Sequence, residues 1–212
     1  MRTRHLINSV LILTGLSINL YSQKQVPVEV QYKTIVFMDE LDAHFYQAAV
    51  NYINFNDAMA AENVRKAAYY ISSETEQMIT KHKDRFIKIG SNLLQLSEDL
   101  DNGKVMNIQQ LVKKFAVTHY ELASYYMELS NTSFKENNIY NSVFFLDAAS
   151  TYLILGAKWI GHEVGQGTRS TRKSIHNLTQ AIRTRNEINT AELKKVLDFI
   201  NKEINKFGNK VS

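Results

Sequence analysis

Two histidines occupy matching places in two similar segments of the chain. The segment from His44 to Tyr52 aligns with the segment from His119 to Met127, since each begins with a histidine, an aromatic residue follows, and an alanine recurs at the same position. Glu40 precedes His44 by one helical turn. Imidazoles and carboxylates from facing helices are the ligands with which helical bundles bind transition metals. The pattern therefore indicates a candidate metal site formed by His44, His119 and Glu40.

Two features of the sequence count against this metal site. The Glu-x-x-His pattern of ferritin-like bundles is absent, because Leu41 stands three residues before His44 and Ala116 stands three residues before His119. A histidine beside an aromatic residue on a helix is also typical of a packed position with a backbone partner. Metal binding and packing both remain open for these histidines.

A second candidate site lies between Gly161 and Lys173. The glycines of this segment interrupt the helical pattern, and the following Thr and Ser residues can cap a new helix. A helix N-terminus attracts anions through its free N–H groups and its partial positive charge. Arg169, Arg172 and Lys173 would add charge there, so we expect them to bind an anion or a partner. The phosphate-loop pattern is absent, and a solvated loop between two helices is the alternative.

No motif for a known catalytic chemistry is present. His162-Glu163 begins like the zinc-protease motif His-Glu-x-x-His, but position 166 is Gln and the second ligand is missing. The chain has no Gly-x-Ser-x-Gly elbow and no cysteine, which excludes a thiol nucleophile and cysteine–zinc sites. The sequence therefore predicts a protein that is not an enzyme and that uses no cofactor.

Composition sets the size and the charge of the molecule. The chain has 212 residues with 44% hydrophobic residues, which suits one globular domain with a substantial core. Its formal net charge is +4, and residues 131–212 carry 12 Lys/Arg against 7 Asp/Glu. This excess favours an acidic partner or an anionic surface, with a solvated helical face as the alternative. Nucleic acid is not expected, because no recognisable binding module accompanies the charge.

The first 22 residues have the pattern of a secretory signal. Arg2 and Arg4 form a basic start, Leu6–Leu20 is largely apolar, and the small Ser22 would precede the cut, leaving Gln23 first. Polar residues interrupt the apolar run, which is shorter than the roughly 20 residues of a membrane span. A cleaved signal is therefore favoured over a membrane anchor, and no later segment is apolar enough to cross a bilayer. We expect export to the periplasm or to the extracellular space.

Apolar residues recur at helical spacing through most of the remaining chain, after an extended lead at residues 26–28. Leu41, Phe45 and Ala48 share one helix face, for example. Ser73 and Glu76 have the spacing of a capping box, so residues 58–100 form either one long helix or two helices. The helices are expected at about 34–55, 58–100, 107–130, 138–160, 170–186 and 190–207, with the polar residues 130–133 weakening the third.

These helices predict an all-α fold, an antiparallel bundle of four to six helices. We expect one domain over residues 23–212, with a hairpin at 34–103, a hairpin at 107–187 and a C-terminal helix at 190–207. The hairpins look duplicated, because the run from Asp57 to Ala68 matches the run from Asn138 to Ala149 at an offset of 81 residues, while the histidine segments match at 75. Chance similarity between alanine-rich helices is the alternative.

This hairpin pattern resembles that of exported YfdX-type proteins. The resemblance covers residues 44–71 and 119–153, and it departs from the family at Asn56-Asp57, where those hairpins tend to carry Gly-Asp. It implies an all-helical exported protein without an established catalytic centre.

These observations together predict a binding or interaction module of the cell envelope. Adjacent aromatic pairs such as Tyr125-Tyr126 and Phe144-Phe145 can place one ring in the core and the other toward a groove. The expected partner is an envelope protein or a hydrophobic or anionic ligand, and homo-oligomerisation is left open. The alternative function is a metal-binding bundle that uses His44 and His119.

Overall fold

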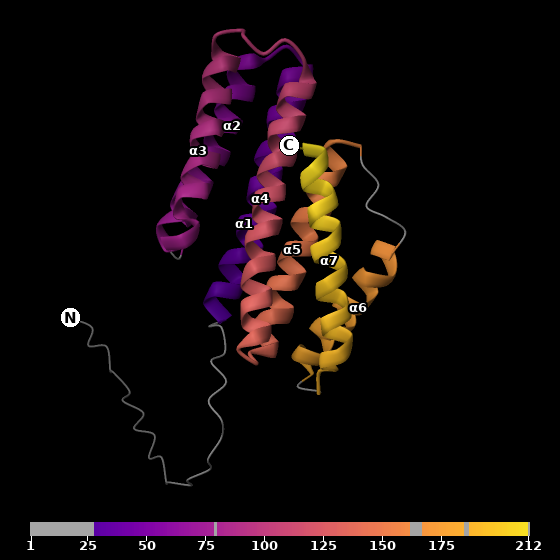
Figure 1. Ribbon diagram of the computed structural model, residues 1–212. Coiled ribbons are helices and arrows are strands. Elements are labelled where there is room, and N and C mark those ends of the chain that lie inside the picture. The colour runs from indigo at the N-terminus through magenta and orange to yellow at the C-terminus, as the bar shows by residue number, and fades with distance from the viewer. Residues whose placement is uncertain (1–27, 79, 162–166, 185–186, 212) are drawn as a thin grey trace, which may run out of the picture.

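The computed structural model describes residues 28–78, 80–161, 167–184 and 187–211, and this part of the chain is all-α (Figure 1). The predicted fold class is confirmed, with seven helices in these residues, one more than the predicted range allows. The helices are α1 (Val28–Ile53), α2 (Asp57–Gln77), α3 (Thr80–Asp101), α4 (Ile108–Lys135), α5 (Ile139–Trp159), α6 (Gly167–Arg183) and α7 (Thr190–Val211). Among the described helices, none combines the length and the hydropathy that a bilayer crossing requires.

Helix α1 joins two groups of helices. It forms an antiparallel hairpin with α2, and α3 packs on the far side of α2 (Figure 1). On its other side α1 contacts α4 and α5, which form a second antiparallel hairpin that α6 and α7 cover. Buried side chains from all seven helices form one continuous hydrophobic core.

The predicted inner face of α1 is confirmed. Leu41, Phe45 and Ala48 are fully buried, as their spacing of three and four residues requires. The Phe45 ring stacks on Phe115 of α4, with ring centroids 4.1 Å apart and planes inclined by 13°. Tyr52, one turn further, is half-buried and its hydroxyl donates a hydrogen bond to the carbonyl of Val105 in the α3–α4 loop, at 3.0 Å. The helical period therefore identified the side of α1 that enters the core.

The chain reverses direction later than the capping-box pattern suggested. Ser73 lies inside α2, where its hydroxyl donates to the carbonyl of Tyr70, so the two-helix alternative for residues 58–100 is correct but the second helix does not start at Ser73. Helix α2 ends at Gln77, and Met78 takes an extended conformation (φ −79°, ψ 154°). Two antiparallel helices, α2 and α3, therefore replace the single long helix, because α3 folds back to pack its apolar stripe on α2.

Two other helix limits also differ from expectation. Helix α4 continues through residues 130–133 to Lys135, because the buried Ser130 donates a hydrogen bond of 2.6 Å to the carbonyl of Ser142 on α5. The polar stretch thus joins two helices and does not weaken one. Helix α1 begins at Val28, which replaces the extended conformation expected there. The predicted signal, residues 1–22, lies outside the described residues.

The α1–α2 and α4–α5 hairpins share one turn geometry. Phe55 and Asn137 both have a left-handed backbone, with φ of 56° and 57°. The next residue in each turn is an asparagine N-cap, and the side chains of Asn56 and Asn138 each accept a hydrogen bond from the backbone N–H three residues later, at 3.3 Å. The N–H of each capping asparagine also donates to the carbonyl five residues earlier. The two turns are therefore equivalent position by position.

This equivalence corrects the alignment of the two hairpins. Matching Asn56 to Asn138 requires an offset of 82 residues, where the sequence comparison used 81 for the second helices and 75 for the first. At 82 residues the fully or nearly fully buried positions coincide, as in the pairs Val64–Leu146, Ala67–Ala149 and Ile71–Leu153. Duplication of one hairpin stays a prediction, now with a single register.

The shared turn predicts a stabilising substitution at Phe55. A bulky residue in the left-handed region is strained, whereas asparagine tolerates it. The Phe55 side chain is 95% exposed and gains little from packing. We therefore expect Phe55→Asn to raise the free energy of unfolding by about 1 kcal/mol, measured by urea denaturation. The reciprocal change Asn137→Phe should lower it by a similar amount, and a loss of stability in Phe55→Asn would contradict the assigned turn.

Candidate functional site

His119 lies at the junction of α1, α4 and α5. Its side chain is fully buried, and Nδ1 lies 2.8 Å from the carbonyl oxygen of Phe115, one turn earlier in α4. Its Nε2 lies 3.5 Å from Oδ1 of Asp42 on α1. The indole of Trp159 on α5 donates to the same Asp42 oxygen at 3.3 Å. The histidine thus belongs to a polar cluster that connects three helices.

The electrostatics of Asp42 follow from this cluster. Partial burial by itself would raise the pKa of the Asp42 carboxyl, but the hydrogen bond and positive charge of His119, together with the bond from Trp159, lower it. The two ring nitrogens of His119 face two oxygens, the Phe115 carbonyl at 2.8 Å and the Asp42 carboxylate at 3.5 Å. Since His119 has no exposed surface, we assign this cluster to holding α1 against α4 and α5.

His44 and Glu40 lie on another face of α1. The His44 Nε2 is 3.9 Å from the Glu40 carboxylate, and the His44 side chain is 21% exposed. His44 follows Asp42 by two residues, which turns it by about 200° around the helix axis. The structure therefore brings Glu40 and His44 together and pairs His119 with Asp42, which lies between Glu40 and His44 in the sequence.

In the corrected register of the two hairpins, the two histidines no longer occupy equivalent positions. At an offset of 82 residues His44 corresponds to Tyr126, not to His119. The offset of 75 residues from the sequence comparison differs from 82 by seven residues, which is about two helical turns. It therefore matched residues on the same face of the two helices, but two turns apart along the helix axis. Within the described residues, no group of three or more His, Cys, Asp or Glu side chains is placed to hold a metal ion. Metal binding by His44, His119 and Glu40 stays a prediction without such a cluster.

The predicted anion-binding residues take different positions. Arg172 lines a polar groove between α5 and α6, opposite Asp147. Lys173, the next residue, is exposed and does not line this groove. Helix α6 begins at Gly167, but the side chain of Arg169 and residues 162–166 lie outside the described part of the chain. Of the three expected residues, the structure therefore places Arg172 at a candidate site.

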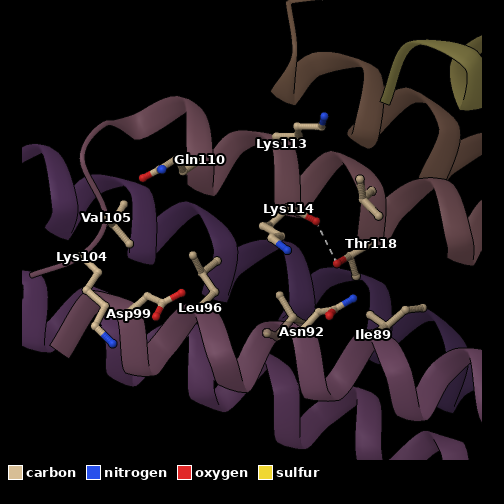
Figure 2. Close-up of a pocket in the computed structure, with 12 residues that line it drawn as sticks. Ile89, Asn92, Leu96, Asp99, Lys104, Val105, Gln110, Lys113, Lys114 and Thr118 are labelled. Carbon is tan, nitrogen blue, oxygen red and sulfur yellow. Dashed lines mark hydrogen bonds between the residues drawn. The ribbon is translucent and has the colours of Figure 1, made fainter. Parts of the chain in front are cut away.

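A larger groove runs between α3 and α4, with a volume of about 320 Å³ (Figure 2). Its apolar lining comes mainly from aliphatic side chains of α3, with valines from α4 and from the α3–α4 loop. These residues are Ile89, Leu93, Leu96, Val105 and Val117. No aromatic side chain lines this groove, and a role of the aromatic pairs in a groove elsewhere stays a prediction. Tyr125 and Tyr126 are instead both buried in the core.

Lysines surround the apolar part of this groove. Lys104 comes from the α3–α4 loop, and Lys113 and Lys114 come from the first turns of α4 (Figure 2). All three side chains are exposed, and none of them forms an ion pair with another described residue. Asp99 is the one acidic residue among the groove's lining residues, and its carboxylate accepts a hydrogen bond from Gln95. The groove thus combines aliphatic walls with a cationic rim.

Ion pairs also connect α3 and α4 outside the lining of the groove. Arg85 pairs with Glu121, and His82 Nε2 lies 3.6 Å from the Glu128 carboxylate. The α3–α4 loop, which contributes Lys104 and Val105 to the lining, is held by the Tyr52–Val105 hydrogen bond. Sequence reasoning missed this groove because its two walls belong to different predicted hairpins, although the adjacent Lys113 and Lys114 at the start of a helix were a visible signal.

Comparison with known proteins does not assign the chain to a family. No protein-family model matches the chain, and no curated protein or solved structure is significantly similar to it. The fold and the two grooves therefore define the class by themselves: an all-α bundle of two hairpins joined through α1, with an aliphatic groove and a polar groove. The resemblance to YfdX-type hairpins stays a prediction.

Proposed function

We propose that this protein is a non-catalytic binding module of the cell envelope that holds a single-chain anionic amphiphile in the α3–α4 groove. One observation carries the proposal: aliphatic walls occur at one groove together with three lysines that form no ion pair among the described residues. An alkyl chain would bury its methylenes against Ile89, Leu93 and Leu96, each buried methylene contributing about 0.8 kcal/mol. A carboxylate or phosphate head group would lie at the lysine rim.

The size and the opening of the groove support this ligand class. A volume of about 320 Å³ lies at the lower end of the range for small-molecule sites. The lysines surround the groove without entering the core, so that the head group stays in contact with water. The predicted export signal would bring the protein to a compartment where membranes supply such amphiphiles.

Calorimetric titration with laurate, below its micelle concentration, tests the proposal. We expect laurate to bind, and dodecyltrimethylammonium, with a similar alkyl chain and the opposite charge, to bind at least tenfold more weakly. The double variant Lys113→Glu/Lys114→Glu should lower the laurate affinity at least tenfold, because two favourable charges become repulsive. Lys195→Glu/Lys202→Glu is the matched control, since these exposed lysines of α7 lie outside the groove and change the net charge equally.

Three outcomes would refute the assignment. These are no binding of laurate, equal binding of the two amphiphiles, or equal losses of affinity in the groove variant and the α7 variant. The last result would indicate a general charge effect and not a site at the lysine rim.

A further inference from the structure

The second groove, between α5 and α6, carries a different chemistry. It has a volume of about 230 Å³ and a mostly polar lining. Helix α6 contributes Arg172, His176 and Arg183, which share one face because they are spaced by four and seven residues. Helix α5 contributes Asp147 across from them. None of these four side chains forms an ion pair within 4 Å among the described residues.

The charges in this groove are not neutralised in close pairs. Two guanidinium groups face a single carboxylate, so the groove keeps a net positive charge whenever Asp147 is ionised. Desolvation by the surrounding protein raises the pKa of Asp147, and the attraction of Arg183, Arg172 and His176 does not fully offset this effect. The cationic side chains of the groove therefore outnumber its single carboxylate.

The hydroxyl groups of the groove are oriented as acceptors. Ser150 and Thr151 donate their hydroxyl protons to the carbonyl of Asp147, and Thr179 donates to the carbonyl of Ile175, each at 2.9 Å. The oxygen lone pairs of these side chains remain available to accept hydrogen bonds. A ligand that fits must accept hydrogen bonds from the arginines, and it can also donate hydrogen bonds from hydroxyl groups of its own.

We propose that the groove between α5 and α6 binds a phosphate monoester of a small polyol, with Arg172 and Arg183 holding the phosphate. Guanidinium groups bind phosphate oxygens through paired hydrogen bonds, and a tetrahedral phosphate accepts from two directions. The volume exceeds that of a phosphate and leaves room for a small hydroxylated group beside Thr151 and Thr179. This site is separate from the α3–α4 groove and does not depend on the function proposed there.

Asp147 would oppose the phosphate through like-charge repulsion. The groups that face this carboxylate are Arg183, Arg172 and His176. Replacing Asp147 by asparagine removes the negative charge and retains a hydrogen-bonding side chain of the same size. The substitution should therefore strengthen binding of an anion, whereas it would have no such effect at a groove that merely contains solvated charges.

Titration of the full mature chain with glycerol 3-phosphate, inorganic phosphate and glycerol tests the site at constant ionic strength. We expect glycerol 3-phosphate to bind most tightly, Arg172→Ala and Arg183→Ala each to lower its affinity at least tenfold, and Asp147→Asn to raise it about threefold. Lys173→Ala is the matched control, because this cation neighbours Arg172 but lies outside the groove. Circular dichroism verifies that each variant is folded.

The proposal fails if glycerol 3-phosphate does not bind at millimolar concentration, or if Lys173→Ala weakens binding as much as Arg172→Ala. It also fails if Asp147→Asn leaves the affinity unchanged. Binding of inorganic phosphate as tightly as the monoester would overturn the polyol part of the assignment and leave a phosphate site.

Discussion

Gly156→Ala is expected to lower the free energy of unfolding by about 2 kcal/mol, although alanine is the better helix former. A methyl group on Gly156 would lie 2.8 Å from Cβ of His119 and 2.8 Å from a ring carbon of Phe207. Both neighbours are almost fully buried, so neither can move away without disturbing the core. At this site α5 packs closely against both α4 and α7.

Gly90→Ala is the matched control for this prediction. Gly90 is also a buried glycine inside a helix, but the nearest atom to an added methyl group is the Ser72 hydroxyl oxygen, at 3.2 Å. Because a serine side chain can rotate, the gain in helix propensity should prevail, and the variant should equal or exceed the wild type by up to about 1 kcal/mol. Urea denaturation followed by circular dichroism measures both variants. Equal effects at the two glycines would contradict the packing of α5 on α7.

His119→Ala should lower the free energy of unfolding by about 3 kcal/mol, whereas His44→Ala should change it by less than about 0.5 kcal/mol. The buried His119 ring packs against Phe45 and Tyr152, with centroid distances of 5.5 and 6.0 Å. Its removal leaves a cavity and deprives Asp42 of one of its two partners. The His44 side chain is partly exposed and has only a long contact with Glu40.

The same pair of variants separates packing from metal binding. A metal ligated by both histidines would raise the thermal midpoint of the wild-type protein on addition of Zn²⁺, and both variants would lose this rise. Packing alone predicts a large loss of stability for His119→Ala and no response to zinc in any of the three proteins. A zinc-dependent rise confined to the wild type would therefore favour the metal-binding alternative.

The Asp42–His119 pair also predicts sensitivity to acid. The folded pKa of Asp42 is below its ordinary value of 3.8. The stabilisation it provides is therefore complete above the unfolded pKa and is lost as the pH falls through the folded value. Asp42→Asn should reduce stability at pH 7 and should flatten the decline below about pH 4, which urea denaturation across this pH range would reveal.

Helical periodicity determined much of the fold before any tertiary contact was considered. Apolar residues three and four apart, such as Leu41, Phe45 and Ala48, can meet only on one side of a helix, so they identified both the helices and their buried faces. The polar break at Asn56 and the turn at Gly103 were visible for a related reason, since capping and a positive φ require particular residue types.

Only the tertiary structure decided the register of the helices and the residues they bring together. Periodicity gives the angle of a residue around its helix axis, but a shift of seven residues leaves this angle almost unchanged. This is why His44 and His119 looked equivalent, while the fold paired His119 with Asp42. Both grooves likewise depend on which helices become neighbours: α3 beside α4 joins aliphatic side chains to the lysines, and α5 beside α6 places Asp147 across from Arg172 and Arg183. These neighbours are selected by the packing of the whole core, which no local pattern encodes.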